Sequence, residues 1–181
     1  MPYPPFNSNN VLPPYVGSWP EVGPLGCSPY LATIREVSAL CTTAERRAIL
    51  SGFLRMRTEL RRLGFAIEAQ WIDGSFCENI EASEGRPPGD IDVLSILAHP
   101  ADAPTLQALV INNQNLFSPR QSKVAFRCDH YAMGADTASL EQICYWNSLF
   151  SHRRNGLWKG YIRLVDEGQA NDDALIATLA A

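Results

Sequence analysis

The sequence has no long apolar run and no leader-like start, and these absences exclude two classes of protein. No apolar stretch approaches the roughly 20 residues that a membrane-spanning helix needs. The first residues, MPYPPFNSNN, lack the basic and apolar regions of a secretory signal peptide. We therefore expect a soluble cytoplasmic protein with no membrane partner.

Cysteine, histidine and positive charge are also too sparse or too scattered for several kinds of site. The five cysteines form no CxxC pair and have no histidine at zinc-ligand spacing, so we expect free thiols in a reducing cytosol. The formal net charge of −4 gives no global attraction to nucleic acid. Any binding of phosphate must therefore be local.

What is present predicts one compact domain with an extension. The 181 residues are 46% hydrophobic, enough for a full core but tight for two domains. Residues 1–29 hold eight of the 13 prolines and show no periodic pattern. We expect them to form an extended Pro-rich arm that packs on a single domain of residues 30–181. A disordered tail, the alternative, would be less hydrophobic.

The longest predicted helix begins at a capping box formed by Thr42 and Glu45 and ends near Leu63, before Gly64. Its apolar residues recur at helical spacing and would face the core. Its six arginines spread over the other side, where a solvated helix face is commoner than the alternative, RNA binding. These arginines are Arg46, Arg47, Arg55, Arg57, Arg61 and Arg62.

The remaining pattern predicts further helices and a small sheet. Helices are expected over 29–40, 75–80, 104–112, 137–151 and 171–181, the last with a frayed tail as the alternative. The helix over 137–151 would turn Leu140, Ile143, Cys144 and Leu149 inward. Strands are expected over 66–72, 90–97, 123–131 and 157–165. The fold class is therefore α/β or α+β, with a small mixed sheet flanked by helices.

Two carboxylates at the start of the second predicted strand carry the chemistry. Asp90 and Asp92 are two residues apart, so their side chains project to the same face of a strand, roughly 6.6 Å apart. At an effective dielectric constant near 20 their repulsion is about 2.5 kcal/mol. Such a pair needs water, a basic side chain or a cation beside it, and hard oxygen ligands suit Mg²⁺.

A possible phosphate-binding turn precedes this pair. Gly74 and Ser75 directly follow the first strand and open a short helix, which places backbone N–H groups and a hydroxyl at a helix N-terminus. Glycine permits close approach of the backbone, and serine adds a donor without bulk. A Gly-Ser turn alone is weak evidence, but it gains specificity when a same-face acid pair begins the next strand.

The stretch Ile72-Asp73-Gly74-Ser75 followed by Asp90-Ile91-Asp92-Val93 resembles the signature of the DNA polymerase β-like nucleotidyltransferase superfamily. That signature is an apolar residue, Gly and Gly/Ser, a variable gap, then alternating acidic and apolar residues. The gap here, residues 76–89, is at or slightly beyond the long end of the usual range. More narrowly, the chain is similar to a small, poorly characterised bacterial family of predicted minimal nucleotidyltransferases.

This resemblance implies a nucleotidyltransferase-like fold and a Mg²⁺-dependent enzyme. Such an enzyme moves a nucleoside monophosphate from a nucleoside triphosphate, ATP among them, to a hydroxyl of RNA, a partner protein or a small molecule. The triphosphate would lie on the Gly74-Ser75 turn, and Asp90 and Asp92 would hold one or two Mg²⁺ ions. Analogy with bacterial relatives suggests a toxin-antitoxin or phage-defence role.

The resemblance also requires a third acid from a neighbouring strand. Asp129 is our choice, as third metal ligand and general base, because Arg127, Asp129 and Tyr131 would share one face of the third strand. The alternative is that Asp129 pairs with Arg127 or ends a strand. Asp136 and Glu141 are weaker choices, because they fall in a turn and at a helix start.

Several other polar and aromatic residues allow two interpretations. Arg153, Arg154 and Lys159 could bind nucleotide phosphates or RNA. Alternatively, they are solvated cations at the C-terminus of a helix, where the helix dipole favours positive charge. Asp73 is expected to stabilise its turn rather than to reach a metal. Trp146 and Trp158 could stack on a base, although core packing is commoner. His130 is expected to be a packed core histidine.

Two rival functions remain open at this point. The first is a catalytically inactive binding or regulatory module with the same fold. The second is an unrelated α/β domain in which Asp90 and Asp92 merely face water at the edge of a sheet. The sequence does not define the oligomeric state.

Overall fold

The protein has a mixed α/β fold built on one five-stranded mixed sheet with strand order β1-β5-β2-β3-β4. The computed structural model describes residues 3–18 and 21–180. The strands are β1 (Tyr30–Thr33), β2 (Ala66–Asp73), β3 (Ile91–Ala98), β4 (Cys128–Gly134) and β5 (Ile162–Val165). β2 pairs antiparallel with β3 and β5, whereas β1 with β5 and β3 with β4 are parallel pairs. The two strands predicted over 66–72 and 90–97 are confirmed as β2 and β3.

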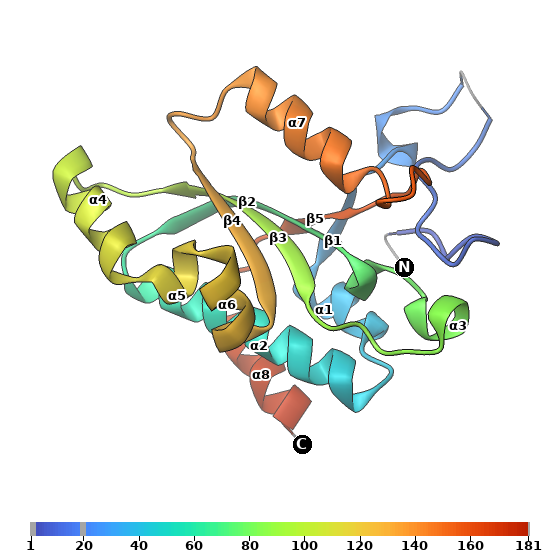
Figure 1. Cartoon of the computed structure of the whole chain (residues 1–181), viewed down its shortest axis with the longest axis horizontal. Helices are drawn as coiled ribbons and strands as arrows, with labels where there is room; N and C mark the ends of the chain where they lie inside the picture. The colour runs from blue at the N-terminus through green and yellow to red at the C-terminus, as the bar shows by residue number, and fades with distance from the viewer. Residues whose placement is uncertain (1–2, 19–20, 181) are drawn as a thin grey trace.

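Helices cover both faces of this sheet (Figure 1). They are α1 (Ile34–Val37), α2 (Ala44–Arg62), α3 (Ile80–Glu84), α4 (Ala103–Asn112), α5 (Gln114–Phe117), α6 (Pro119–Phe126), α7 (Leu140–Phe150) and α8 (Gln169–Ala180). Short 3-10 turns lie at Pro24–Gly26, Ser38–Leu40 and Ser75–Cys77. α2, α5, α6 and α8 lie below the sheet in Figure 1, and α7 lies above it.

Alternation along the strands divides the core into two clusters, one on each face. Ile72, Val93 and Ile162 point to the face covered by α2, α5 and α6, where the larger cluster lies. Trp71, Leu94 and Met133 point to the other face, where Phe150 of α7 covers them. His130 is fully buried between the Leu116 carbonyl and the Ser95 hydroxyl, and burial lowers its pKa to about 4. The expectation of a packed core histidine is confirmed.

The long helix α2 differs from the prediction in its cap and in its arginines. Thr43, not Thr42, is the N-cap, because its side chain accepts from the Arg46 N–H. Gly64 follows the helix with a positive φ of 92°, as expected of a stop. Arg46 and Arg57 are buried rather than solvated, at 3% and 1% exposure. A solvated face would leave both in water, but each is compensated by carboxylates from distant parts of the chain.

Three predicted element boundaries are wrong. Residues 29–40 begin with the strand β1 and only then turn into α1. The strand predicted over 123–131 is instead the end of α6 followed by β4, with Arg127 between them in the left-handed conformation at φ 57°. The strand predicted over 157–165 is shorter, because regular pairing starts at Ile162. The helix predicted over 104–112 is confirmed as α4, and that over 171–181 as α8, although residue 181 lies outside the described residues.

The inner face of α7 is also different from the prediction. Leu140 and Leu149 are 74% and 48% exposed, and Cys144 is exposed as well. Ile143 contacts the core as predicted, together with Trp146 and Phe150, so the expectation of core packing is confirmed for Trp146. Trp158 is 61% exposed, so the expectation of core packing is wrong for this tryptophan.

The described part of the proline-rich N-terminal segment contacts the rest of the chain. Val11 and Leu12 are buried, and the Leu12 carbonyl accepts from the Gly160 N–H at 2.7 Å. The Tyr30 hydroxyl donates to the Pro13 carbonyl at 2.8 Å. Residues 1, 2, 19 and 20 lie outside the described residues. The domain boundary at residue 29 stays a prediction.

Among residues 3–18 and 21–180, no helix is both long and apolar enough to cross a membrane.

Candidate functional site

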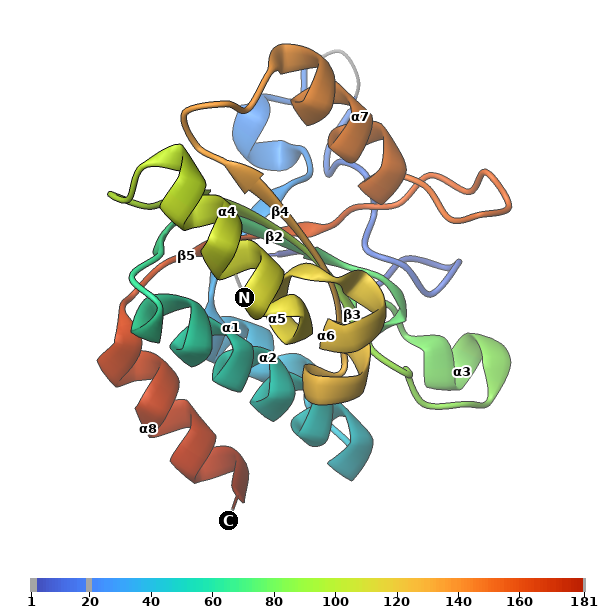
Figure 2. The ribbon, with the colours of Figure 1, turned by 60° about the vertical axis from the view of Figure 1, so that its left-hand side comes forward.

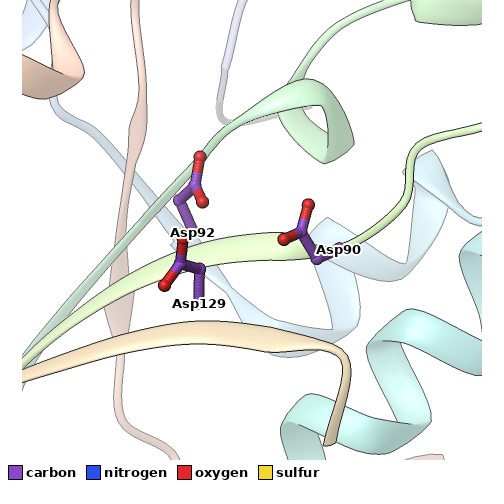
Figure 3. Close-up of side chains that lie close together, drawn as sticks. All are labelled: Asp90, Asp92 and Asp129. Carbon is purple, nitrogen blue, oxygen red and sulfur yellow. The ribbon is translucent and has the colours of Figure 1, made fainter. Parts of the chain in front are cut away.

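Three carboxylates from adjacent strands meet on the face of the sheet that α7 covers. Asp92 and Asp129 are register partners in the parallel pair β3-β4, and Asp90 directly precedes β3. One carboxylate oxygen from each of Asp90, Asp92 and Asp129 lies within 4.8 Å of the others. Figure 3 shows the three side chains at this point of the sheet. We call them the carboxylate triad.

The turn after β2 lies against this triad. Asp73 ends β2 opposite Asp92, and Gly74 follows with φ 80°. A Cβ atom at Gly74 would lie 2.5 Å from Asp92 Oδ2, closer than side chains approach. A larger residue at this position would have to displace the Asp92 carboxylate, in addition to adopting the positive φ. Ser75 then opens the 3-10 turn Ser75–Cys77, and α3 starts at Ile80, so the short helix predicted over 75–80 is split in two.

The triad and the turn open into one cavity of about 690 Å³. All eight residues that the sequence singled out for metal or nucleotide binding line it. They are Gly74, Ser75, Asp90, Asp92, Asp129, Arg153, Arg154 and Lys159. Four separate segments of the chain (74–75, 90–92, 129 and 153–159) therefore converge on one cavity that could hold a nucleotide-sized ligand.

The three carboxylates of the triad differ in whether a basic side chain neutralises them. Asp90 forms an ion pair with Lys123 of α6. No described basic side chain lies within ion-pair distance of Asp92 or Asp129. Burial, together with the charges of Asp90 and Asp129, raises the pKa of Asp92 to about 6. The folded protein thus holds more negative charge at this point than its own side chains neutralise.

A second, buried ion network lies beside the triad. Lys159 is 3% exposed, and its ammonium contacts Asp73 Oδ1 at 2.7 Å and Glu78 Oε1 at 3.0 Å. Arg153 forms an ion pair with the other oxygen of Glu78. The Asp73 carboxylate also hydrogen-bonds the backbone of Gly74, so Asp73 contacts its turn as expected and is in addition paired with Lys159.

The three predicted phosphate ligands differ in availability. Arg153 and Lys159 line the cavity, but both charges are engaged by carboxylates. Arg154 is exposed, and none of the ion pairs between described residues includes it. Arg154 is thus the cation of this loop most available to a phosphate.

The sequence suggested that Arg127 and Asp129 share one face of a strand, and the structure contradicts this. Its left-handed backbone ends α6, and its carbonyl accepts from the Ile91 N–H at 3.1 Å. The proposed pairing of Asp129 with Arg127 is absent from the ion pairs of the described residues. Asp129 is therefore left facing Asp92.

Sequence reasoning missed Lys123 and Glu78, which complete the charge balance of the cavity. Lys123 was assigned to a strand, so its approach to Asp90 from a helix was not visible. The signal that could have found it is Ser118-Pro119, a favourable helix start. Glu78 has no such signal, because its partners Lys159 and Arg153 lie about 75 to 80 residues away.

The donor chemistry of the triad fits a divalent cation. Three carboxylates supply hard oxygen ligands, which Mg²⁺ and Mn²⁺ prefer. Their oxygens converge within 4.8 Å, and Asp92 and Asp129 have no basic ion-pair partner within residues 3–18 and 21–180. A cation held by Asp90, Asp92 and Asp129 would remove the excess negative charge.

Comparison with known proteins finds one family. A family model described as "Family of unknown function (DUF6932)" matches residues 4–165. No curated protein and no solved structure matches the chain.

Proposed function

The chain belongs to this family of unknown function, and we propose that it is a Mg²⁺-dependent nucleotidyltransferase. One observation carries the proposal: the carboxylate triad, which could hold a divalent cation, and the Gly74-Ser75 turn line the same cavity of about 690 Å³. The likeness of residues 72–75 and 90–93 to the nucleotidyltransferase signature supports the same reaction.

The proposed reaction transfers a nucleoside monophosphate to a hydroxyl. The hydroxyl oxygen bonds to the α-phosphorus of a nucleoside triphosphate, and pyrophosphate leaves with the bridging oxygen. Asp129 accepts the hydroxyl proton. Bound Mg²⁺ would neutralise charge on the phosphate oxygens.

The chain's own groups position the reactants. The Gly74-Ser75 turn offers backbone N–H groups and a hydroxyl to phosphate oxygens, and Gly74 lets these approach the triad closely. Arg154 supplies an exposed positive charge at the cavity. The Asp73-Lys159-Glu78 network holds the turn to the loop after α7, so the phosphate and metal sides keep a fixed separation.

Two measurements test this function. Isothermal titration with Mg²⁺ and each of the four nucleoside triphosphates tests binding. Incubation with α-labelled triphosphates and total cell extract tests transfer, and the label is then located in RNA, protein or small molecules. We expect label transfer that falls at least about 100-fold in Asp90→Asn and Asp92→Asn, because such losses follow removal of groups that stabilise developing charge.

Asp136→Asn is the matched control, because Asp136 is an exposed acid that does not line the cavity. It should transfer label like the unchanged protein. Binding without transfer would reject the enzyme and support a regulatory module. Absence of nucleotide binding would reject both.

A further inference from the structure

The segment that leads to Asp129 is free of acidic residues, although the chain as a whole is acidic. Residues 103–128 contain no Asp and no Glu, whereas the whole chain has a net charge of −4. The same segment holds Arg120, Lys123 and Arg127. It forms α4, α5, α6 and the start of β4, so it carries a local positive charge beside the carboxylate triad.

Three cations lie on α6 and at its C-terminal end. Arg120 and Lys123 are three residues apart within α6, a spacing that places their side chains near one another on the helix surface. Arg127 is the C-cap that follows α6, and its left-handed backbone lies outside the helix. All three are exposed, whereas Ser122 and Phe126 of α6 are buried. We call Arg120, Lys123 and Arg127 the α6 basic face.

This face ends at the candidate site. Lys123 forms the ion pair with Asp90, and the Arg127 carbonyl is hydrogen-bonded to the N–H of Ile91, between Asp90 and Asp92. α6 packs against β4, the strand that carries Asp129 and pairs with β3 (Figure 2). A polyanion lying along α6 would therefore arrive at the carboxylate triad.

The two arginines are available to such a ligand. None of the ion pairs within residues 3–18 and 21–180 includes Arg120 or Arg127. Arginine presents a planar fork of donors that suits phosphate oxygens. Exposed cations next to an acidic site attract a ligand that carries repeated negative charge outside the cavity and a neutral reacting group inside it.

The cavity restricts the form of this ligand. The triad lies within a cavity of about 690 Å³, so only a small part of a long polyanion can enter it. Tyr131 lines the same cavity, two residues after Asp129. Its ring packs against Trp146 and is half-buried, and its exposed part can contact a base. Repeated phosphates, a terminal hydroxyl and a stacking base together define a single-stranded nucleic acid.

We propose that the acceptor is the terminal hydroxyl of a single-stranded nucleic acid, whose backbone phosphates bind the α6 basic face. This inference rests on the proposed transfer reaction, because it names the molecule that provides the hydroxyl. The terminal oxygen bonds to the α-phosphorus, pyrophosphate leaves, and the strand becomes one nucleotide longer.

Fluorescence anisotropy with end-labelled 12-residue oligonucleotides tests the surface without any reaction. The full chain is titrated, in EDTA and without triphosphate, against RNA, DNA of the same sequence, and the matching duplex. We expect a single strand to bind more tightly than the duplex, and the RNA and DNA arms identify the preferred sugar. Arg120→Glu/Arg127→Glu should weaken binding at least about 10-fold. It should also reduce the slope of log affinity against log salt by roughly 1.4, as expected for two lost phosphate contacts.

Arg35→Glu/Arg163→Glu is the matched control, since it makes the same change in charge. Arg35 and Arg163 are exposed and lie in α1 and β5, away from the β4 edge of the sheet. This variant should bind like the unchanged protein. Arg120→Gln/Arg127→Gln repeats the test without introducing negative charge.

Three results would overturn the inference: no binding of either single strand, equal loss in both double variants, or equally tight binding of poly-glutamate. Because this assay needs neither metal nor turnover, it separates the inference from the proposed function. Binding on α6 without any nucleotide transfer would reject only the enzyme. Transfer to a protein or small molecule, without oligonucleotide binding, would reject only the nucleic-acid acceptor.

Discussion

At the scale of single residues, the candidate site depends on how closely the Gly74 backbone approaches the Asp92 carboxylate. The glycine combines φ 80° with ψ −168°, a backbone conformation that other residues avoid. The same glycine leaves no room for a Cβ atom beside Asp92 Oδ2. The backbone conformation at Gly74 and its close approach to Asp92 therefore each favour glycine. Two substitutions can measure the two effects separately.

Gly74→Ala should lower the free energy of unfolding by about 2 kcal/mol or more, because backbone strain and a displaced Asp92 add together. Gly85→Ala is the comparison, since Gly85 also has a positive φ of 66° but nothing within 4 Å of its Cβ position. It should lose only about 1 kcal/mol. Urea denaturation measures both. Mn²⁺ affinity should fall in Gly74→Ala alone, and an equal fall in both variants would refute the contact.

Residues whose roles depend on spacing along one strand were predictable, and residues paired across the fold were not. The two-residue spacing of Asp90 and Asp92 follows from strand geometry and needs no partner. The ion pair of Asp73 was not predictable, because its partner, Lys159, is 86 residues away in sequence. A local pattern gives no information about such a pair.

At the scale of elements, the region from α6 to β4 shows where sequence periodicity fails. The helix α6 has only eight residues and is followed at once by β4, so the two patterns merge into one apparent strand. Arg127 separates them through a left-handed conformation that is uncommon for arginine. The error moved Lys123 from a helix to a strand and so hid the α6 basic face.

Buried ion pairs attach α8 to α2. Asp172 of α8 is 1% exposed and contacts Arg57 and Arg61 of α2 at 2.7 and 2.5 Å. Arg57 is equally buried and also forms an ion pair with Asp166. A buried guanidinium needs these carboxylates, because removing one partner leaves an uncompensated charge.

Asp172→Ala should therefore lower the free energy of unfolding by about 3 kcal/mol, the lower part of the range for a broken buried pair, since Asp166 remains. Asp173→Ala removes the neighbouring acid, which is exposed, and should change stability by no more than about 0.5 kcal/mol. Denaturant titration of the two variants compares them directly. Similar losses would show that the ion cluster does not hold α8 in place.

At the scale of the whole molecule, the fold brings together acidic side chains that repel one another. This repulsion lowers the stability of the ligand-free protein at its candidate site. Asp73, Asp92 and Asp129 are register neighbours across β2, β3 and β4. Lys159 compensates Asp73, but Asp92 has no ion-pair partner among the described residues. Groups arranged in this way lower the stability of the ligand-free protein and are stabilised by a ligand.

Asp92→Asn should make the metal-free protein more stable at pH 7.5 and abolish its response to Mg²⁺. Burial and the neighbouring acids raise the pKa of Asp92 to about 6 in the folded protein, against about 3.9 when unfolded. Above pH 6 the Asp92 carboxylate is therefore ionised in the folded protein, and this ionisation lowers the free energy of unfolding by up to about 3 kcal/mol. This penalty is relieved as the pH falls from 6 towards 4, because the folded state then takes up a proton that the unfolded state does not.

In EDTA, the stability gained by Asp92→Asn should thus be about 1–3 kcal/mol at pH 7.5 and should shrink at pH 5. Mg²⁺ at 100 times its dissociation constant should stabilise the unchanged protein by about 2.7 kcal/mol and the variant hardly at all. Thermal and urea unfolding with and without Mg²⁺ measure both effects. The idea of a cation-dependent triad fails if the variant is no more stable in EDTA, or if Mg²⁺ stabilises both proteins equally. A crossing of the two stabilities on adding Mg²⁺ would show that these carboxylates are held together for a cation rather than for the fold.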